Sequence, residues 1–111
     1  MAGISTHILN ASIGQPAPQV VVKLLRQFER SIVTLDVQQT DQDGRIKAFQ
    51  IDKLVKGNYQ LVFEVGSYFE QQHVPSFYPR VCIDFTVTDQ HQHYHVPLLI
   101  SPFSYSTYRG S

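Results

Sequence analysis

Four groups of polar residues in this sequence have side chains that could take part in catalysis. The first is Ser5-Thr6-His7, whose histidine can titrate close to neutral pH. The second is the segment 41–45, which ends on Arg45, a planar cation able to bind an anionic or carbonyl oxygen. The other two are the histidine-rich segment 91–95 and the C-terminal segment 103–111. Acid–base chemistry beside a fixed cation is the reaction type that these residues indicate.

The first two groups also have purely structural interpretations. A lone histidine such as His7 is more often a structural or surface residue, and Arg45 alone is an ordinary solvated charge. Asp41-Gln42-Asp43-Gly44 resembles the start of a calcium loop, but Lys47 and Phe49 follow where further oxygen ligands are needed. We therefore expect a turn that delivers Arg45 to the start of a strand.

The histidine-rich segment raises the question of a metal site. His91, His93 and His95 alternate, so they would share one face of a continuous strand. Zinc needs three ligands within tetrahedral reach, whereas same-face residues on one strand lie about 7 Å apart. We expect His91 to lie in a loop and no metal to bind. His95 faces away from Tyr94 and Val96 and can project toward a partner or a cleft.

The C-terminal segment is rich in hydrogen-bonding groups, with Tyr105, Tyr108, Arg109 and Ser111 close together. Chain ends are by default frayed or on the surface. A polar edge strand can also be held in place by pairing with another chain. Both interpretations remain open for this segment on its residues alone.

The elements that must position these groups are mainly strands. Apolar and polar residues alternate through most of the chain, and clusters of Gly, Pro, Asn and Asp separate the alternating runs. In the predicted strand 31–39, Val33, Leu35 and Val37 share a face, and residues 89–92 form a hairpin loop. The predicted strands cover 6–9, 20–28, 31–39, the residues from 45, 59–65, 80–88 and 93–100.

One helix of about two turns is predicted before Pro75. Ser67 and Glu70 have the spacing of a capping box, which favours a helix start there. Seven to eight short strands with one short helix predict an all-β, two-sheet β-sandwich. A length of 111 residues is enough for one core, so we expect a single domain over residues 1–111.

The composition disfavours several classes of partner. Nine Lys and Arg balance nine Asp and Glu, so nucleic acid and acidic lipid are unlikely partners. The single cysteine, Cys82, lies between Val81 and Ile83 and is predicted to be a structural thiol in a strand. No basic start with a long apolar run and no membrane-length apolar run is found. We expect a cytoplasmic protein with no cofactor and no membrane partner.

In order and spacing, a set of motifs across the whole chain resembles the transthyretin-like family, specifically its 5-hydroxyisourate hydrolase branch. The hydrolases keep the histidines, the arginine and the Tyr-Arg-Gly-Ser ending that the vertebrate hormone carrier has lost, and all are present here. One departure is Ser104, where the hydrolase pattern usually has glycine. The matching motifs are Ser5-Thr6-His7-Ile8-Leu9-Asn10, Gly14-Gln15-Pro16-Ala17, Asp43-Gly44-Arg45, Gly66-Ser67-Tyr68-Phe69, Phe77-Tyr78-Pro79, His93-Tyr94-His95-Val96-Pro97-Leu98-Leu99 and Tyr105-Ser106-Thr107-Tyr108-Arg109-Gly110-Ser111.

The resemblance implies a reaction and an assembly. The reaction is hydrolysis of the lactam C–N bond of 5-hydroxyisourate to 2-oxo-4-hydroxy-4-carboxy-5-ureidoimidazoline, in urate (purine) degradation. The assembly is a homotetramer, a dimer of dimers with active sites in a channel between the dimers. A carrier that holds a small aromatic ligand in the same channel is the competing interpretation, and a sandwich used only for assembly is a weaker one.

The resemblance also implies roles for individual residues. His7 and His95 share the base and acid roles, and Arg45 stabilises the oxygen that gains negative charge. Tyr108 and Ser111 position substrate or water, and Arg109 is a second cation. The catalytic set is thus His7, Arg45, His95 and Ser111, and the substrate-binding set is His7, Arg45, Tyr108 and Arg109. Metal-free attack by water is favoured over a nucleophilic Ser111, because no Ser-His-Asp order is found. Which histidine is the base, and which subunit supplies each residue, stays open.

Overall fold

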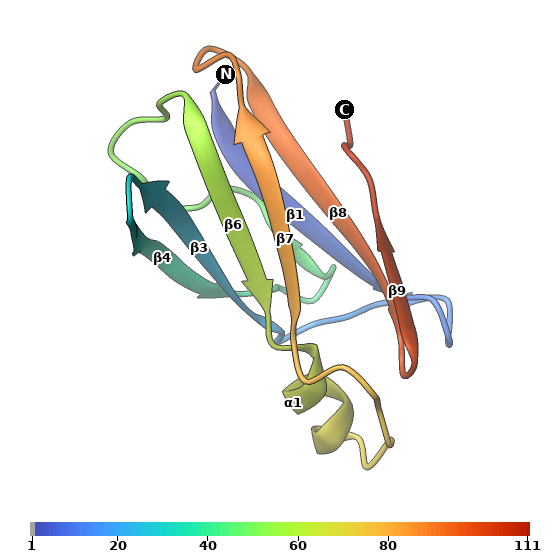
Figure 1. The fold of residues 1–111 in the computed structure, drawn as a ribbon. Coiled ribbons are helices and arrows are strands. Elements are labelled where there is room, and N and C mark those ends of the chain that lie inside the picture. The colour runs from blue at the N-terminus through green and yellow to red at the C-terminus, as the bar shows by residue number, and fades with distance from the viewer. Residues whose placement is uncertain (1) are drawn as a thin grey trace.

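The computed structural model describes residues 2–111, which form two β-sheets stacked face to face with a short helix at one end (Figure 1). The first sheet has the strand order β2-β1-β8-β9, and β5 pairs with the same edge of β1 as β2, over two other residues of β1. β1 and β8 run parallel, and the other strand pairs of this sheet are antiparallel. Its strands are β1 (Gly3–Asn10), β2 (Gln15–Pro16), β5 (Arg45–Ile46), β8 (His93–Ser101) and β9 (Ser104–Thr107).

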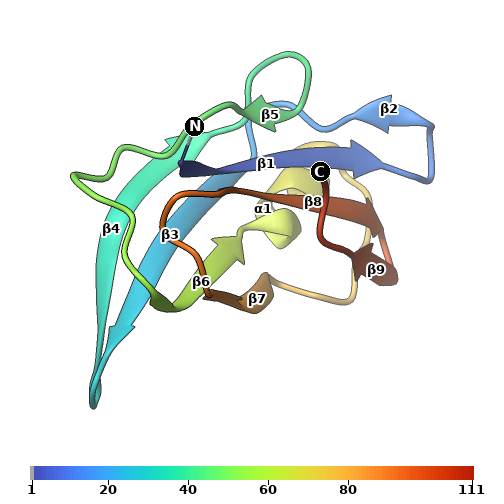
Figure 2. The ribbon, with the colours of Figure 1, turned by 90° about the horizontal axis from the view of Figure 1, so that it is seen from above.

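The second sheet is antiparallel with the order β4-β3-β6-β7. Seen from above, it curves as a separate layer beside the first sheet, and the C-terminal segment lies next to β8 (Figure 2). Its strands are β3 (Val21–Phe28), β4 (Ser31–Gln39), β6 (Gly57–Phe63) and β7 (Val81–Val87), and the helix α1 (Val65–Gln71) connects β6 to β7.

Alternation along the strands builds the core between the two layers. Ile4 and Ile8 of β1 and Leu98 of β8 are fully buried, and they face Leu24 and Leu61 of the second sheet in one cluster. The predicted all-β, two-sheet sandwich with one short helix is therefore confirmed. Within residues 2–111 there are nine strands, more than the seven to eight predicted, because β2 and β5 are pieces of two residues.

The predicted common face of Val33, Leu35 and Val37 is wrong. The register of β4 against β3 shifts at a β-bulge, so Val33 pairs with Arg26 and Val37 pairs with Lys23. Arg26 and Lys23 point to opposite faces of β3, because they are an odd number of residues apart. The bulge at Leu35 thus sends the two valines to opposite faces, which a period-two pattern does not reveal.

The predicted hairpin at residues 89–92 is also wrong, because the segment joins the two sheets. β7 pairs with β6, whereas β8 pairs with β1 and β9. The Tyr94 hydroxyl accepts hydrogen bonds from the N–H groups of Thr88 (3.1 Å) and Asp89 (2.9 Å) and so anchors this crossover. His91 lies in the turn, which confirms its predicted place in a loop.

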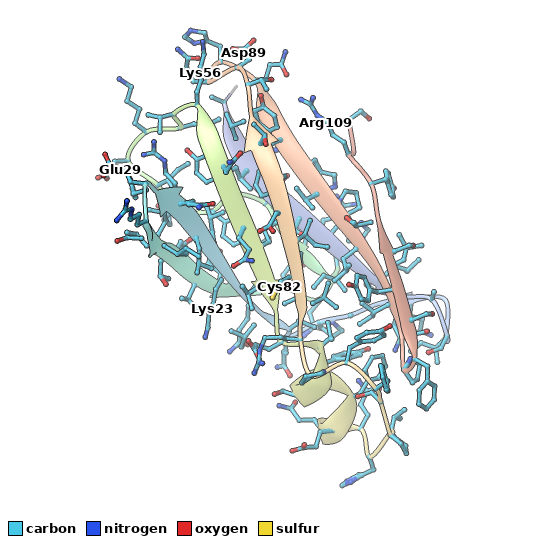
Figure 3. All side chains as sticks on the ribbon, in the orientation of Figure 1. Lys23, Glu29, Lys56, Cys82, Asp89 and Arg109 are labelled. Carbon is cyan, nitrogen blue, oxygen red and sulfur yellow. The ribbon has the colours of Figure 1, made fainter. Side chains whose placement is uncertain are left out.

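Two smaller predictions differ from the structure. The helix is confirmed, but it starts two residues before Ser67, its N-cap is Glu64, and no side chain caps it, so the capping box does not form. Cys82 lies on a strand as predicted, but its side chain is on the exposed face of β7 rather than in the core (Figure 3). Among residues 2–111, no helix is long and apolar enough to cross a membrane.

Candidate active site

The outer face of the first sheet carries three of the residues expected to do chemistry. Ile4 and Ile8 point into the core, so the alternating Ser5 and His7 point out of the sandwich. The parallel register of β1 and β8 pairs Ser5 with His95, and β5 pairs Arg45 with His7. The structure therefore brings His7, Arg45 and His95 onto one sheet face.

A tight turn places Arg45 opposite His7. The Asp41 carboxylate accepts hydrogen bonds from the N–H groups of Asp43 and Arg45, both at 2.9 Å. The bond from the Arg45 N–H is the main reason that the pKa of Asp41 is lowered, against a smaller effect of burial. Gly44 has φ +73°, and an added Cβ would lie 2.5 Å from the carbonyl oxygen of Ile8. The predicted turn is confirmed, and the Asp41 carboxylate holds its backbone.

A serine joins two of the histidines. The Ser5 hydroxyl lies 2.7 Å from Nε2 of His93 and 2.7 Å from Nδ1 of His95. Ser5 is only 6% exposed, while His93 is exposed and His95 is half-buried. In the sequence, Ser5 lies close to His7, and the alternation of His91, His93 and His95 suggests only a metal ligand for His93. The parallel pairing of β1 with β8 creates this contact, and the local pattern of neither strand predicts it.

The surroundings of His95 favour its neutral form. Partial burial lowers the pKa of the imidazole below its ordinary value of 6.5. The charges of His7, His93 and Arg45 lower it further, since each positive neighbour opposes a second positive charge. At neutral pH His95 therefore has an unprotonated nitrogen available to accept a proton.

The C-terminal segment closes one side of the histidine cluster. Gly110 forms a bridge with His95, in which its N–H donates to the His95 carbonyl at 2.9 Å. A Cβ on Gly110 would lie 2.6 Å from Cδ2 of His95 and 3.1 Å from Cγ of Pro97. A side chain at this position would therefore collide with the imidazole ring, which gives the glycine of the Tyr-Arg-Gly-Ser ending a physical role.

The histidine cluster and Arg45 border a shallow hollow of about 240 Å³ on the outer face of the first sheet. Its lining combines imidazoles, a guanidinium, an ammonium group and three hydroxyl-bearing side chains, so acid, base and cation reach the same space. The hollow is lined by Ser5, Thr6, Arg45, Ile46, Lys47, His93, His95 and Ser111. His7 lies next to it as the strand partner of Arg45.

Tyr108 and Arg109 lie on a neighbouring hollow of about 260 Å³, which shares only His95 with the first. The Arg109 guanidinium packs over the Tyr94 ring at 4.6 Å, and its Nη2 donates to Oε1 of Gln92 at 2.9 Å. Figure 3 shows Arg109 projecting from the C-terminal segment toward the end of the sandwich that carries Asp89. Within one chain, the structure thus separates Tyr108 and Arg109 from the hollow that contains Arg45 and Ser111.

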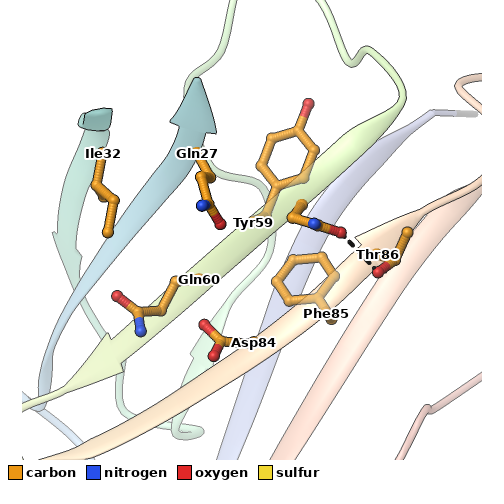
Figure 4. A pocket seen from close by; sticks show the side chains of 8 residues that line it. Gln27, Ile32, Tyr59, Gln60, Asp84, Phe85 and Thr86 are labelled. Carbon is orange, nitrogen blue, oxygen red and sulfur yellow. Dashed lines mark hydrogen bonds between the residues drawn. The ribbon is translucent and has the colours of Figure 1, made fainter. Parts of the chain in front are cut away.

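A third hollow, of about 270 Å³, lies on the second sheet and has a different chemical character (Figure 4). Its polar lining consists of amides, a tyrosine, one hydroxyl and the Asp84 carboxylate, and the Thr86 hydroxyl donates to Oδ1 of Asn58 at 2.8 Å. No histidine, lysine or arginine is among its eight lining residues. It therefore lacks the acid–base pair and the cation that the hollow on the first sheet provides.

Comparison with known proteins places this site in context. The model of the HIUase/Transthyretin family matches residues 4–110. A 5-hydroxyisourate hydrolase of Salmonella dublin is 43% identical, over 97% of this chain and 80% of that protein. The solved 5-hydroxyisourate hydrolase of Klebsiella pneumoniae is 42% identical over 99% of this chain and all of that chain, with a TM-score of 0.88. Sea bream transthyretin in complex with thyroxine is 27% identical over 97% of this chain and 94% of that chain, with a TM-score of 0.91.

Proposed function

This chain belongs to the HIUase/Transthyretin family, and from that membership together with its site we infer that it hydrolyses 5-hydroxyisourate. It cleaves the lactam C–N bond to give 2-oxo-4-hydroxy-4-carboxy-5-ureidoimidazoline, a step of urate and hence purine degradation. The hydrolases of Salmonella dublin and Klebsiella pneumoniae, 43% and 42% identical, support this substrate. The observation that carries the inference is the meeting of His7, Arg45 and His95 on one sheet face.

Arg45 stabilises the lactam oxygen as water adds to the carbonyl carbon and this oxygen gains negative charge. The turn at Gly44 fixes the backbone of Arg45, and Arg45 borders the hollow beside the histidines. A cation that is already in place does not have to reorganise in the transition state. Removing one such donor typically lowers kcat by a factor of about 10²–10³.

His7 and His95 share the two proton transfers of the reaction. One imidazole takes a proton from the attacking water, and the other gives a proton to the nitrogen that leaves as the C–N bond breaks. The lowered pKa of His95, caused first by burial and then by its positive neighbours, suits it to accept a proton at neutral pH. This scheme uses no metal, because the imidazoles and the guanidinium supply both proton transfer and charge stabilisation.

Ser111 orients water or substrate in the hollow, and direct attack by water is preferred to attack by this serine. The His95 ring bonds Ser5 through Nδ1, and among residues 2–111 no hydrogen bond joins a histidine ring to the Ser111 hydroxyl that would activate it as a nucleophile. Tyr108 and Arg109 bind substrate from the neighbouring hollow, where they adjoin His95. Their contact with the reacting ring depends on the assembled protein.

The working unit is a homotetramer in which two chains join edge to edge and two such dimers face each other across a channel. Two features of the single chain support this. β9 is an edge strand whose four residues are all exposed, and the hollow around His95 opens on an exposed sheet face. The protein acts in the cytoplasm, a reducing compartment in which its single cysteine, Cys82, stays a thiol.

Ligand carriage is the second candidate function. The observation that favours it is the similarity to sea bream transthyretin in complex with thyroxine, at a TM-score of 0.91. A carrier needs an apolar or complementary channel but no matched acid, base and cation. The combination of His7, Arg45 and His95 is therefore the feature that separates the two functions.

Single substitutions in the tetramer test the proposed roles. His7→Ala, Arg45→Ala and His95→Ala should each lower the turnover of 5-hydroxyisourate by about 10²–10⁴ and leave fold and assembly intact. His91→Ala is the matched control, because His91 lies exposed in a turn outside the hollow, and it should keep wild-type turnover. Near-normal turnover in any of the three test variants would remove that residue from the mechanism.

A further inference from the structure

The Ser5 hydroxyl occupies a position that the scheme above leaves unused. It lies between two imidazole nitrogens, 2.7 Å from each, and is 6% exposed. A serine hydroxyl has one hydrogen to donate and can accept a hydrogen bond as well. When the Ser5 hydroxyl donates its hydrogen to one of the two rings, it accepts a hydrogen bond from the other ring. The protonation of His93 therefore determines the tautomer of His95.

The backbone fixes the relative positions of Ser5, His93 and His95. β1 and β8 pair in parallel over eight residues, with Gly3 opposite His93 and Ser5 opposite His95. The His93 ring leans over Gly3, where a Cβ would lie 3.4 Å from its Nδ1, and its Nε2 faces Ser5. His95 has Gly110 against its Cδ2 edge, so its ring has little freedom to turn away. The arrangement leaves Nε2 of His95 as the nitrogen that does not face Ser5.

We propose that Ser5 is a positioning residue that joins His93 and His95 into one proton-sharing unit, with His93 holding the charge while His95 acts on the substrate. This proposal rests on the proposed catalytic role of His95. When Nε2 of His95 takes a proton from water, its Nδ1 proton passes to Ser5 Oγ, and Ser5 passes its own hydrogen to Nε2 of His93. His95 and Ser5 end neutral, and His93 ends as an imidazolium. His7 then protonates the leaving nitrogen, and the reverse transfer, with loss of the proton from Nε2 of His95 to water and return of a proton from water to His7, restores the starting state.

The electrostatics of the site explain why a second histidine helps. A charge on His95 is opposed by burial and by its positive neighbours His7 and Arg45, whereas the His93 side chain is exposed to water. Moving the charge to His93 places it where water can solvate it. The titratable and charged groups that border His95 from the surrounding elements are His7, Arg45, Lys47, Asp84, His93, Tyr94, Tyr108 and Arg109.

The test combines kinetics with NMR of histidine nitrogens in the full-length assembly. Ser5→Ala should lower kcat for 5-hydroxyisourate roughly 10- to 100-fold, as for groups that orient a functional histidine, with KM little changed. Ser5→Thr keeps the hydroxyl and should restore most of the kcat. Ser67→Ala, an exposed serine of α1 outside the hollow, is the matched control and should behave as wild type.

The NMR readout distinguishes proton sharing from packing and does not depend on turnover. In the wild type, protonating His93 should shift the Nδ1 and Nε2 resonances of His95, and Ser5→Ala should abolish this coupling. His93→Gln, a change at an exposed side chain, serves in place of Ser5→Ala if that variant does not fold, and should likewise lower kcat.

Each outcome of the test decides the proposal. Loss of kcat with unchanged His95 resonances would make Ser5 a packing residue and overturn the proposal, as would unchanged kcat. An inactive wild type with coupled histidines would refute the hydrolase function and leave the proton sharing standing. An inactive wild type without coupling would refute both.

Discussion

Replacing Gly110 with alanine tests whether the C-terminal segment serves the histidine site. The added Cβ would lie 2.6 Å from Cδ2 of His95, about 0.8 Å inside the 3.4 Å at which ordinary contact begins. Either the His95 ring turns away, or the backbone bridge between the two residues opens and carries Ser111 out of the hollow. Both responses displace a proposed catalytic group.

The size of the effect follows from this displacement. A shift of about 1 Å at a reacting group can cost roughly 10²-fold in rate. We therefore expect Gly110→Ala to lower kcat about 10²-fold. Because the neighbouring Arg109 and Ser111 are exposed, the segment can yield, and the free energy of unfolding should change by less than about 1 kcal/mol.

The assay follows the decay of freshly generated 5-hydroxyisourate by absorbance, and thermal unfolding reports the stability of each variant. Ser67→Ala is the control, since it changes an exposed residue of the helix α1 and leaves the His95 ring untouched. Gly110→Val should be at least as slow as Gly110→Ala, because its side chain is larger. A kcat for Gly110→Ala within twofold of wild type would refute the role given to the bridge.

Three further predictions concern the same face. Deleting residues 109–111 should abolish turnover while the chains still assemble on size-exclusion chromatography; a fully active truncated tetramer would contradict this. Gly44→Ala should lower the free energy of unfolding in urea by at least about 1–2 kcal/mol, because φ is +73° and the new Cβ would meet a backbone oxygen at 2.5 Å; wild-type stability would count against the proposed turn constraint. The His95 resonances should titrate below 6.5, since burial, then His7, His93 and Arg45, lower its pKa. The contribution of neutral His95 to the free energy of unfolding is then fully present above pH 6.5 and is lost as the pH falls through the pKa of the folded state. A midpoint of the His95 titration at or above 6.5 would show that the site does not disfavour the charged ring.

Local patterns predicted most of the fold because the sandwich buries one face of most strands. β7 illustrates this, since Val81, Ile83, Phe85 and Val87 alternate and face the core as the sequence indicates. The pairing partners of the strands depend on contacts between distant segments, and period-two alternation does not encode them. The alternating pattern therefore predicts a hairpin at residues 89–92, although this segment crosses between the sheets.

The candidate site shows the same division between local and long-range information. The sequence identified His7, Arg45 and His95 by residue type and by family resemblance, and the structure places them on one face. It did not identify Ser5 as a partner of the histidines, because that contact requires the parallel register of β1 and β8. The sequence pattern also does not predict that Arg109 packs on Tyr94, because the two residues lie in different segments of the fold.

The measurement that tests the central claim most directly is the decay of 5-hydroxyisourate with and without the wild-type protein. The substrate is generated freshly from urate, and its spontaneous decay gives an internal reference rate in the same cuvette. The account predicts that the protein accelerates decay strongly and that His95→Ala returns it to the spontaneous rate. Decay no faster than the spontaneous rate with the folded wild-type assembly would contradict the account and favour ligand carriage.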